Sequence, residues 1–269
     1  MYFDSHLHLQ NKDYDSDRDI VINSLSSKGI DLCVCVGYDL QSSTKAVELA
    51  ERYQNIFAAV GVHPSDSHLF NDSTIFQLQQ LAQNKKVVAI GEIGLDYYRQ
   101  HDKAKQQQVF DQQIQLANTI QKPYIIHLRD AFDDFDALYL NTPPKYGAVI
   151  HCFTGNAQQA KKYVDKGYHI SLSGIITFKN AQSIRNAAQV IPLDSILIET
   201  DSPYLAPTPH RGKTNYPEYI SLVAQELAIL QNKTVAQIAQ ITKDNAKKLF
   251  RIVDWLYNVN CIYYIIQTL

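Results

Sequence analysis

Two histidines near the start of the chain, His6 and His8, have the spacing of a metal-binding pair. They lie in residues 1–10, which combine Tyr, Phe and Leu with neither glycine nor proline and are therefore expected to form a strand. Side chains two positions apart in a strand project from the same face, so the two imidazoles point together. Neutral imidazoles in this arrangement chelate a divalent cation. Two polar side chains on the solvent-exposed face of an edge strand are the alternative interpretation of this motif taken alone.

More histidines and carboxylates follow apolar runs further along the chain. They are His63, Glu92, His127, His151 and Asp201. The turns that follow strands are usually rich in Gly, Asn, Asp and Ser, so turn chemistry does not account for this repetition. Each residue alone has a structural explanation, such as a surface histidine, a helix N-cap or a polar group at the rim of the fold. Their common position at the ends of apolar runs instead favours one shared site.

The elements that must position these residues alternate between strand and helix. We expect strands at residues 1–10, 31–37, 56–62, 87–92, 123–127, 147–151, 168–172 and 195–201, and helices at 17–28, 42–53, 74–82, 103–121, 133–140, 157–166, 181–190, 218–230 and 235–250. Several of the strands are continuously apolar, as is typical of parallel strands buried on both faces.

This alternation, uninterrupted by a linker, predicts an α/β protein with a single (β/α)₈ TIM barrel at residues 1–251 and an apolar C-terminal extension at residues 252–269. A doubly wound open sheet is the alternative. It would favour a glycine-rich phosphate-binding loop after the first strand, and residues 7–12 contain no glycine.

The active-site face of such a barrel is formed by the C-terminal ends of its strands, which is where these residues fall. We expect a metal site made by His6, His8, Glu92, His127, His151 and Asp201. A catalytic tetrahedral ion takes three protein ligands and keeps one position open, so this larger set suits two divalent ions. Glu92 is the expected bridge, with His6, His8 and Asp201 on one ion and His127 and His151 on the other. Such a pair of ions activates water for hydrolysis, with Asp201 as the expected general base.

Composition restricts the class of protein. The chain has 269 residues, 45% of them hydrophobic and 19% charged, as in an ordinary globular protein. A formal net charge of −2 is not the basic footprint of a duplex-binding protein, although it is compatible with an enzyme that binds a few nucleotides. Cys33 and Cys35 lie in an apolar run and are expected to be buried, reduced thiols. We find no signal sequence and no apolar run near the roughly 20 residues that cross a bilayer, so we expect a cytoplasmic protein without a membrane partner.

Six segments of the chain together resemble the TatD family, a group of metal-dependent hydrolases within the amidohydrolase-like superfamily. They are residues 3–8 (FDSHLH), 61–64 (GVHP), 89–98 (AIGEIGLDYY), 125–131 (IIHLRDA), 150–155 (IHCFTG) and 199–207 (ETDSPYLAP). The resemblance implies a deoxyribonuclease that hydrolyses phosphodiester bonds, typically by 3′→5′ exonucleolytic trimming of single-stranded DNA ends. It also implies Mg²⁺, Mn²⁺ or Zn²⁺ as cofactors and the ligand roles given above, with Glu92 and Asp201 as the catalytic carboxylates.

Three further residues are candidates for contact with the substrate. His63 stands at the rim of the barrel, Arg129 follows His127 by two residues, and Arg211 lies on the loop after the last strand. Arginine presents a planar fork to phosphate oxygens. The alternatives are a rim histidine packed by its neighbouring proline, an ion pair between Arg129 and a nearby aspartate, and a solvated loop at Arg211. Tyr98 is a candidate for stacking on a base or for simple loop packing.

The sequence is compatible with two other functions. An amidohydrolase or lactonase acting at a carbonyl would use the same metal pair, but a modified lysine bridges the metals in many such enzymes, where this chain has Glu92. A metal-binding scaffold that presents nucleic acid is the non-enzymatic alternative, and the presence of Asp201 disfavours it.

The extension at residues 252–269 is apolar and prone to form strands, so it covers the barrel floor, contacts another subunit or is poorly ordered. We expect a monomer or a weak homo-oligomer.

Overall fold

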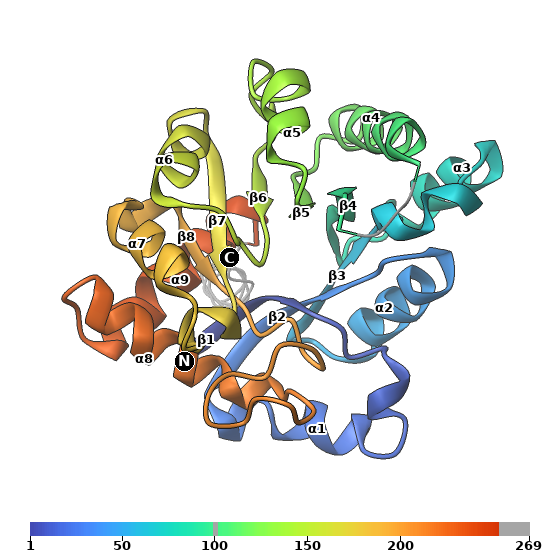
Figure 1. Cartoon of the computed structure of the whole chain (residues 1–269). Coiled ribbons are helices and arrows are strands. Elements are labelled where there is room, and N and C mark those ends of the chain that lie inside the picture. Colours follow the sequence, from blue (N-terminus) through green and yellow to red (C-terminus); the bar gives the residue numbers. More distant parts are fainter. Residues whose placement is uncertain (99–101, 253–269) are drawn as a thin grey trace, which may run out of the picture.

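The computed structural model describes residues 1–98 and 102–252. Within these residues, eight strands form one sheet in the order β1 to β8, and each pairs in parallel with the next. The strands are β1 (Tyr2–Leu7), β2 (Ile30–Val36), β3 (Ile56–Val60), β4 (Val87–Asp96), β5 (Tyr124–Arg129), β6 (Ala148–Ile150), β7 (Tyr168–Leu172) and β8 (Ile196–Ile198). Figure 1 shows them arranged around a central axis with the helices outside. The (β/α)₈ barrel predicted from the sequence is confirmed.

The helices follow the strands as the alternation requires. They are α1 (Arg18–Ser24), α2 (Leu40–Arg52), α3 (Asp72–Leu81), α4 (Lys103–Thr119), α5 (Phe132–Leu138), α6 (Ala157–Asp165), α7 (Gln182–Val190), α8 (Ile220–Leu230) and α9 (Val235–Leu249), with short 3₁₀ turns such as η3 (Pro64–Leu69) between elements. Capping boxes begin α2, α3, α6 and α9 and supply partners for the free N–H groups of their first turns. No helix in the described part of the chain is long and apolar enough to cross a membrane.

Some element boundaries differ from those predicted. β4 continues past residue 92 to Asp96, so Glu92 lies inside a strand and not at its end. The continuation is stable because Gly94 and Asp96 pair with His127 and Arg129 of β5. His127 also lies inside its strand, whereas His151 directly follows β6. The helix expected at residues 17–28 is divided into α1 and a 3₁₀ turn, η2 (Ser26–Lys28).

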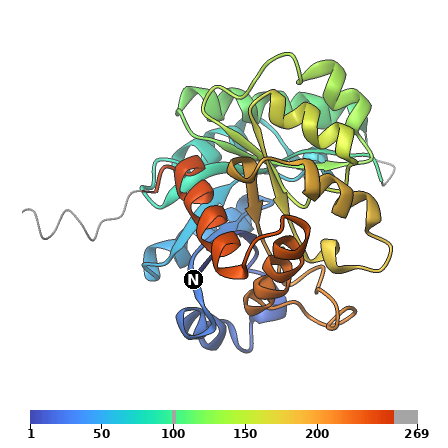
Figure 2. The ribbon, with the colours of Figure 1, turned by 90° about the vertical axis from the view of Figure 1, so that its left-hand side faces the viewer.

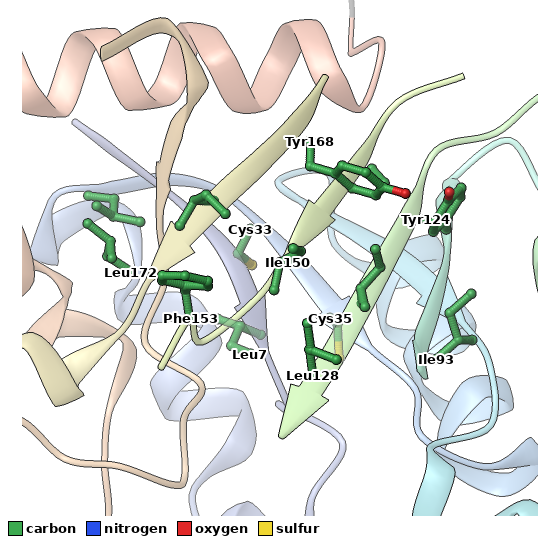
Figure 3. Close-up of a cluster of buried hydrophobic side chains, with 14 of the residues drawn as sticks. Leu7, Cys33, Cys35, Ile93, Tyr124, Leu128, Ile150, Phe153, Tyr168 and Leu172 are labelled. Carbon is green, nitrogen blue, oxygen red and sulfur yellow. The ribbon is translucent and has the colours of Figure 1, made fainter. Parts of the chain in front are cut away.

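Alternate residues of the strands face two separate hydrophobic layers. In β2, Val34 and Val36 pack inside the barrel, while Cys33 and Cys35 belong to the layer between strands and helices. Figure 3 shows part of this outer layer, including the two cysteines. Both thiols are buried and free, as predicted.

Helix α9 covers one end of the barrel. Phe250, which follows this helix, packs against Phe3 of β1 with ring centroids 6.1 Å apart, and Leu249 belongs to the same interior cluster. Figure 2 shows the helix lying across that end of the sheet. The predicted apolar extension begins at Ile252, and the rest of it lies outside the described residues.

The barrel is joined between β8 and β1 largely by residues that follow β8. In the described part of the chain these two strands share no strand ladder. The backbone N–H of Asp201 donates to the carbonyl of His6 at 2.9 Å, and the N–H of His8 donates to the carbonyl of Ser202 at 2.8 Å. Deeper in the barrel, the carboxylate of Asp4 accepts hydrogen bonds from the N–H and hydroxyl of Thr200 at 3.0 and 2.5 Å. These bonds bring the first and last strands together at the position of the predicted metal site.

Candidate metal centre

The six predicted ligands converge at the C-terminal ends of the strands, beside a cleft of about 540 Å³. The cleft wall includes His8, Glu92, His127, His151 and Asp201. His6 is fully buried behind them. A concave site with converging polar groups is the usual form of an enzyme's active site.

Glu92 lies at the centre of the group, and its two oxygens face different histidines. Oε1 is 2.8 Å from Nδ1 of His127 and 2.8 Å from Nε2 of His151. Oε2 is 3.5 Å from Nε2 of His6 and 3.9 Å from Nε2 of His8. A carboxylate placed in this way is able to bridge two ions, one on each side.

Asp201 completes the group around His6 and His8. Its Oδ1 is 3.3 Å from Nε2 of His8 and 3.6 Å from Nε2 of His6, and the two Nε2 atoms are 3.2 Å apart. Asp201 has a φ of 55°, in the left-handed region that aspartate tolerates better than most residues. Its hydrogen bond to the backbone of His6 fixes it there. Imidazole nitrogens and carboxylate oxygens at these separations are a suitable donor set for divalent cations.

Hydrogen bonds behind two of the histidines set which ring nitrogen faces the centre with its lone pair. Nδ1 of His8 lies 2.7 Å from the carbonyl of Val36, and Nε2 of His127 lies 3.0 Å from Oδ2 of Asp96. Because carbonyl and carboxylate oxygens only accept, these nitrogens carry the proton. The opposite nitrogens also lie near carboxylate oxygens, Oε1 of Glu92 and Oδ1 of Asp201, so they donate while protonated and become metal ligands on losing that proton.

Asp96 and Glu199 are residues of the site to which the sequence assigned no role. Asp96 lies four residues after Glu92 in the same strand, so its side chain is on the same face. Glu199 Oε1 lies 3.3 Å from Nδ1 of His151 and accepts the N–H of Cys152 at 2.7 Å. Period-two spacing from Glu92 and from Asp201 is the sequence signal that indicates both.

The charges of the site favour a bound cation. Burial by itself raises the pKa of Glu92, but the charge of His151 and the hydrogen bonds with His127 and His151 outweigh it, and the net pKa is well below the usual range. Burial likewise opposes ionisation of Asp201, yet its hydrogen bond with His8 lowers its pKa. Both carboxylates are thus ionised at neutral pH and available as ligands.

His63 lies closer to the metal site than a residue at the rim of the barrel would. Its Nε2 is 3.6 Å from Oε1 of Glu92, and with His127 these residues form a further cluster able to hold an ion. Its Nδ1 accepts the backbone N–H of Ser65 at 3.1 Å, so the proton of the neutral ring is on Nε2. Burial and the charge of His127 lower the pKa of His63 to about 3, which keeps the ring neutral.

The two candidate arginines are placed differently. Arg129 is exposed and lines the cleft, and its guanidinium carbon is 3.7 Å from the centre of the Tyr98 ring. Within the described residues it forms no ion pair with an aspartate. The guanidinium of Arg211 instead lies 4.2 Å from the Phe178 ring, and Arg211 is not part of the cleft wall.

The comparisons with known proteins agree with this geometry. A family model described as TatD related DNase matches residues 3–251. The chain is 41% identical over 254 residues to YabD of Bacillus subtilis, described as an uncharacterized metal-dependent hydrolase, and the match covers 94% of this chain and 100% of YabD. It is also 41% identical to YcfH of Escherichia coli K12, which has the same description, with 93% and 95% covered.

A solved structure shows the same relationship. The crystal structure of YJJV, a TatD homologue from Escherichia coli K12, superposes with a TM-score of 0.88 at 32% identity, over 94% of this chain and 98% of that one. A TatD family hydrolase from Entamoeba histolytica has the same fold, with a TM-score of 0.81 at 23% identity over 92% and 97% of the two chains. The extent of these matches shows that the chain belongs to the TatD family of metal-dependent hydrolases.

Proposed function

We propose that this chain is a deoxyribonuclease that removes nucleotides from the 3′ ends of single-stranded DNA with the help of two divalent ions, Mg²⁺, Mn²⁺ or Zn²⁺. The observation that carries the proposal is the position of Glu92, whose two oxygens face separate groups of histidines beside an open cleft. Two ions held in this way suit in-line displacement at phosphorus. The description of the matching family model as TatD related DNase supports the choice of substrate.

Each of the six predicted ligands has a defined part in this proposal. His6, His8 and Asp201 would hold one ion, His127 and His151 would hold the other, and Glu92 would bridge them. The ions would lower the pKa of a water molecule and neutralise charge on the phosphate. Asp201, which lines the cleft as a carboxylate, would accept the proton of the attacking water.

Two residues in this proposal contact the substrate. His63 donates a hydrogen bond from Nε2, since its Nδ1 is occupied by the N–H of Ser65. Arg129 binds a phosphate from the wall of the cleft. Arg211 has no such part in this proposal, because its side chain packs on Phe178 outside the cleft wall.

The test uses protein stripped of metal, with Mg²⁺, Mn²⁺ or Zn²⁺ restored separately. Wild type and Asp201→Asn are incubated with single-stranded DNA labelled at its 5′ end, and the products are separated by length. We expect wild type to shorten the DNA one nucleotide at a time and the variant to bind metal with little or no turnover. Near wild-type turnover in the variant would remove Asp201 from the mechanism.

A negative result also has a defined meaning. Absence of cleavage by protein shown to hold both ions would refute the nuclease proposal. A carbonyl-directed amidohydrolase or lactonase would then be the better interpretation, because the same ions polarise a carbonyl group. Hydrolysis of simple lactones and amides by the same preparation would test it.

A further inference from the structure

Two buried polar atoms behind the metal centre lack partners. Nδ1 of His6 and Oε2 of Glu199 make no hydrogen bond, and both residues are fully buried. One is a ring nitrogen that can donate a proton, and the other is a carboxylate oxygen that can accept it. Leaving both unpaired in the protein interior is unfavourable, so some further contact is expected in the working enzyme.

The two residues are neighbours, and His151 joins them. The rings of His6 and His151 stack with centroids 3.9 Å apart and planes 11° from parallel. One ring nitrogen of each histidine and one carboxylate oxygen of Glu199 lie within 4.8 Å of one another. Oε1 of Glu199 already contacts Nδ1 of His151 and the N–H of Cys152. Oε2 is therefore the oxygen left for His6.

We propose that Glu199 is a positioning residue shared by the two halves of the metal centre. Its Oε1 orients His151, and its Oε2 accepts the Nδ1–H of His6 when the ions are bound. Each proton is then held on Nδ1, which leaves Nε2 of both rings as the metal-binding atom. Val36 lies behind His8 and Asp96 behind His127. Each of the four histidine ligands then has a separate acceptor oxygen.

This inference rests on the two-ion site of the proposed function and makes a sharper prediction than that proposal does. Loss of an acceptor behind a metal-binding histidine typically weakens metal binding 10- to 100-fold. Because Glu199 contacts a ligand from each half, its loss must weaken both ions together. Asp96 contacts His127 alone among the ligands, so its loss must weaken one ion only.

The variant Glu199→Gln tests the contact with His6 with almost no change of shape, and Glu199→Ala removes the acceptors of both histidines. The N–H of Cys152 selects the amide oxygen of the new side chain, which turns its NH₂ group toward His6. That NH₂ group donates to Nδ1 of His6 and forces the ring proton onto Nε2, where the ion should bind. Titration of the metal-free protein with Mn²⁺ or Zn²⁺, followed by calorimetry, measures each affinity without reference to activity.

We expect Glu199→Gln, which keeps an acceptor oxygen for His151, to lower the affinity of the ion on His6 about 10- to 100-fold and to leave the other nearly unchanged. Glu199→Ala removes both acceptors and should lower both affinities, whereas the matched variant Asp96→Asn should lower only that of the ion on His127. Wild-type affinity for both ions in Glu199→Gln, or loss of only one affinity in Glu199→Ala, would overturn the inference while leaving the two-ion proposal intact. Binding of a single ion by wild type would contradict the two-ion proposal itself. A third ion that wild type binds and Glu199→Gln loses would overturn the inference in favour of a cation between His6 and Glu199.

A measurement on wild type keeps the inference testable if Glu199→Gln fails to fold. Long-range ¹H–¹⁵N NMR spectra report which nitrogen of each histidine carries the proton. In Zn²⁺-loaded protein we expect His6 to be protonated on Nδ1, with a slowly exchanging, downfield proton signal. A metal-bound Nδ1, or an Nδ1 proton that exchanges rapidly with water, would overturn the shared role of Glu199.

Discussion

Replacing Thr200 by valine should weaken the junction that closes the barrel. The hydroxyl of Thr200 bonds to Oδ2 of Asp4, and its backbone N–H bonds to Oδ1 of the same carboxylate. Valine has nearly the same shape as threonine but cannot form the first of these bonds. Both Asp4 and Thr200 are fully buried, so water cannot replace the missing partner.

The expected destabilisation follows from that burial. Burial raises the pKa of Asp4 to about 8 against the opposing hydrogen bonds of Thr200. In either protonation state, the substitution leaves one buried oxygen of the carboxyl group without its partner, and the backbone N–H of Ser202 loses the same hydroxyl as its acceptor. A buried polar group left unsatisfied costs about 1–3 kcal/mol. In a domain of this size, that change in the free energy of unfolding lowers the melting temperature by about 2–12 °C.

The assay is urea-induced unfolding of the metal-free protein, so that metal affinity does not contribute to the result. Thr200→Ser restores the hydroxyl and should lose no more than about 1 kcal/mol, the value of one methyl group. Thr242→Val is a matched control, because among the described residues the hydroxyl of Thr242 bonds only to the Ile238 carbonyl of its own helix. If Thr200→Val and Thr242→Val changed the free energy of unfolding equally, the junction would not have the role described here.

Three further predictions concern the metal, the substrate and the packing of β4. Chelation of the ions should lower the melting temperature and abolish hydrolysis. Metal added back at 100 times its dissociation constant should raise the free energy of unfolding by about 2.7 kcal/mol. An unchanged melting curve after confirmed metal loss would contradict this prediction. Arg129→Ala should raise KM for single-stranded DNA and reduce the salt dependence of binding by roughly one phosphate contact. Arg211→Ala should leave both quantities within about twofold of wild type. Equal effects of the two substitutions would show that a place in the cleft wall does not decide which arginine binds phosphate. Gly94→Ala should destabilise the fold by more than about 3 kcal/mol in thermal unfolding. The φ of Gly94 is +141°, and an added Cβ would lie 2.1 Å from the carbonyl oxygen of His127. Gly167 also has a positive φ but open space around it, so Gly167→Ala should lose only about 1–2 kcal/mol.

The candidate ligands could be predicted from the sequence because parallel strands bring their C-terminal ends together. Once the apolar runs indicate a barrel, a histidine or carboxylate at the end of any run belongs to the same face, whatever its distance along the chain. His6 and His8 needed only the two-residue period of a strand. The function class followed from the type and number of these residues together with the family resemblance.

The boundaries of β4 could not be predicted in the same way. Gly94 is typical of a turn, and the sequence around it suggests that the strand ends at Glu92. The strand continues because its backbone pairs with β5, a contact that involves residues more than thirty positions away, such as His127. For the same reason, Asp96 acquires its role only when β5 places His127 beside it.

Local sequence patterns along the chain therefore determined which side chains could bind metal, while the tertiary structure decided how they are shared. The two oxygens of Glu92 face separate histidine groups only after three other strands, β1, β5 and β6, are in place. The direction of a long side chain is equally a tertiary property, since Arg211 packs on Phe178 and Arg129 on Tyr98. Asp4 and Thr200 are 196 residues apart, and their contact exists only because the last strand returns to the first. Residue types and short-range periodicity carry the chemistry, but contacts between distant segments set its geometry.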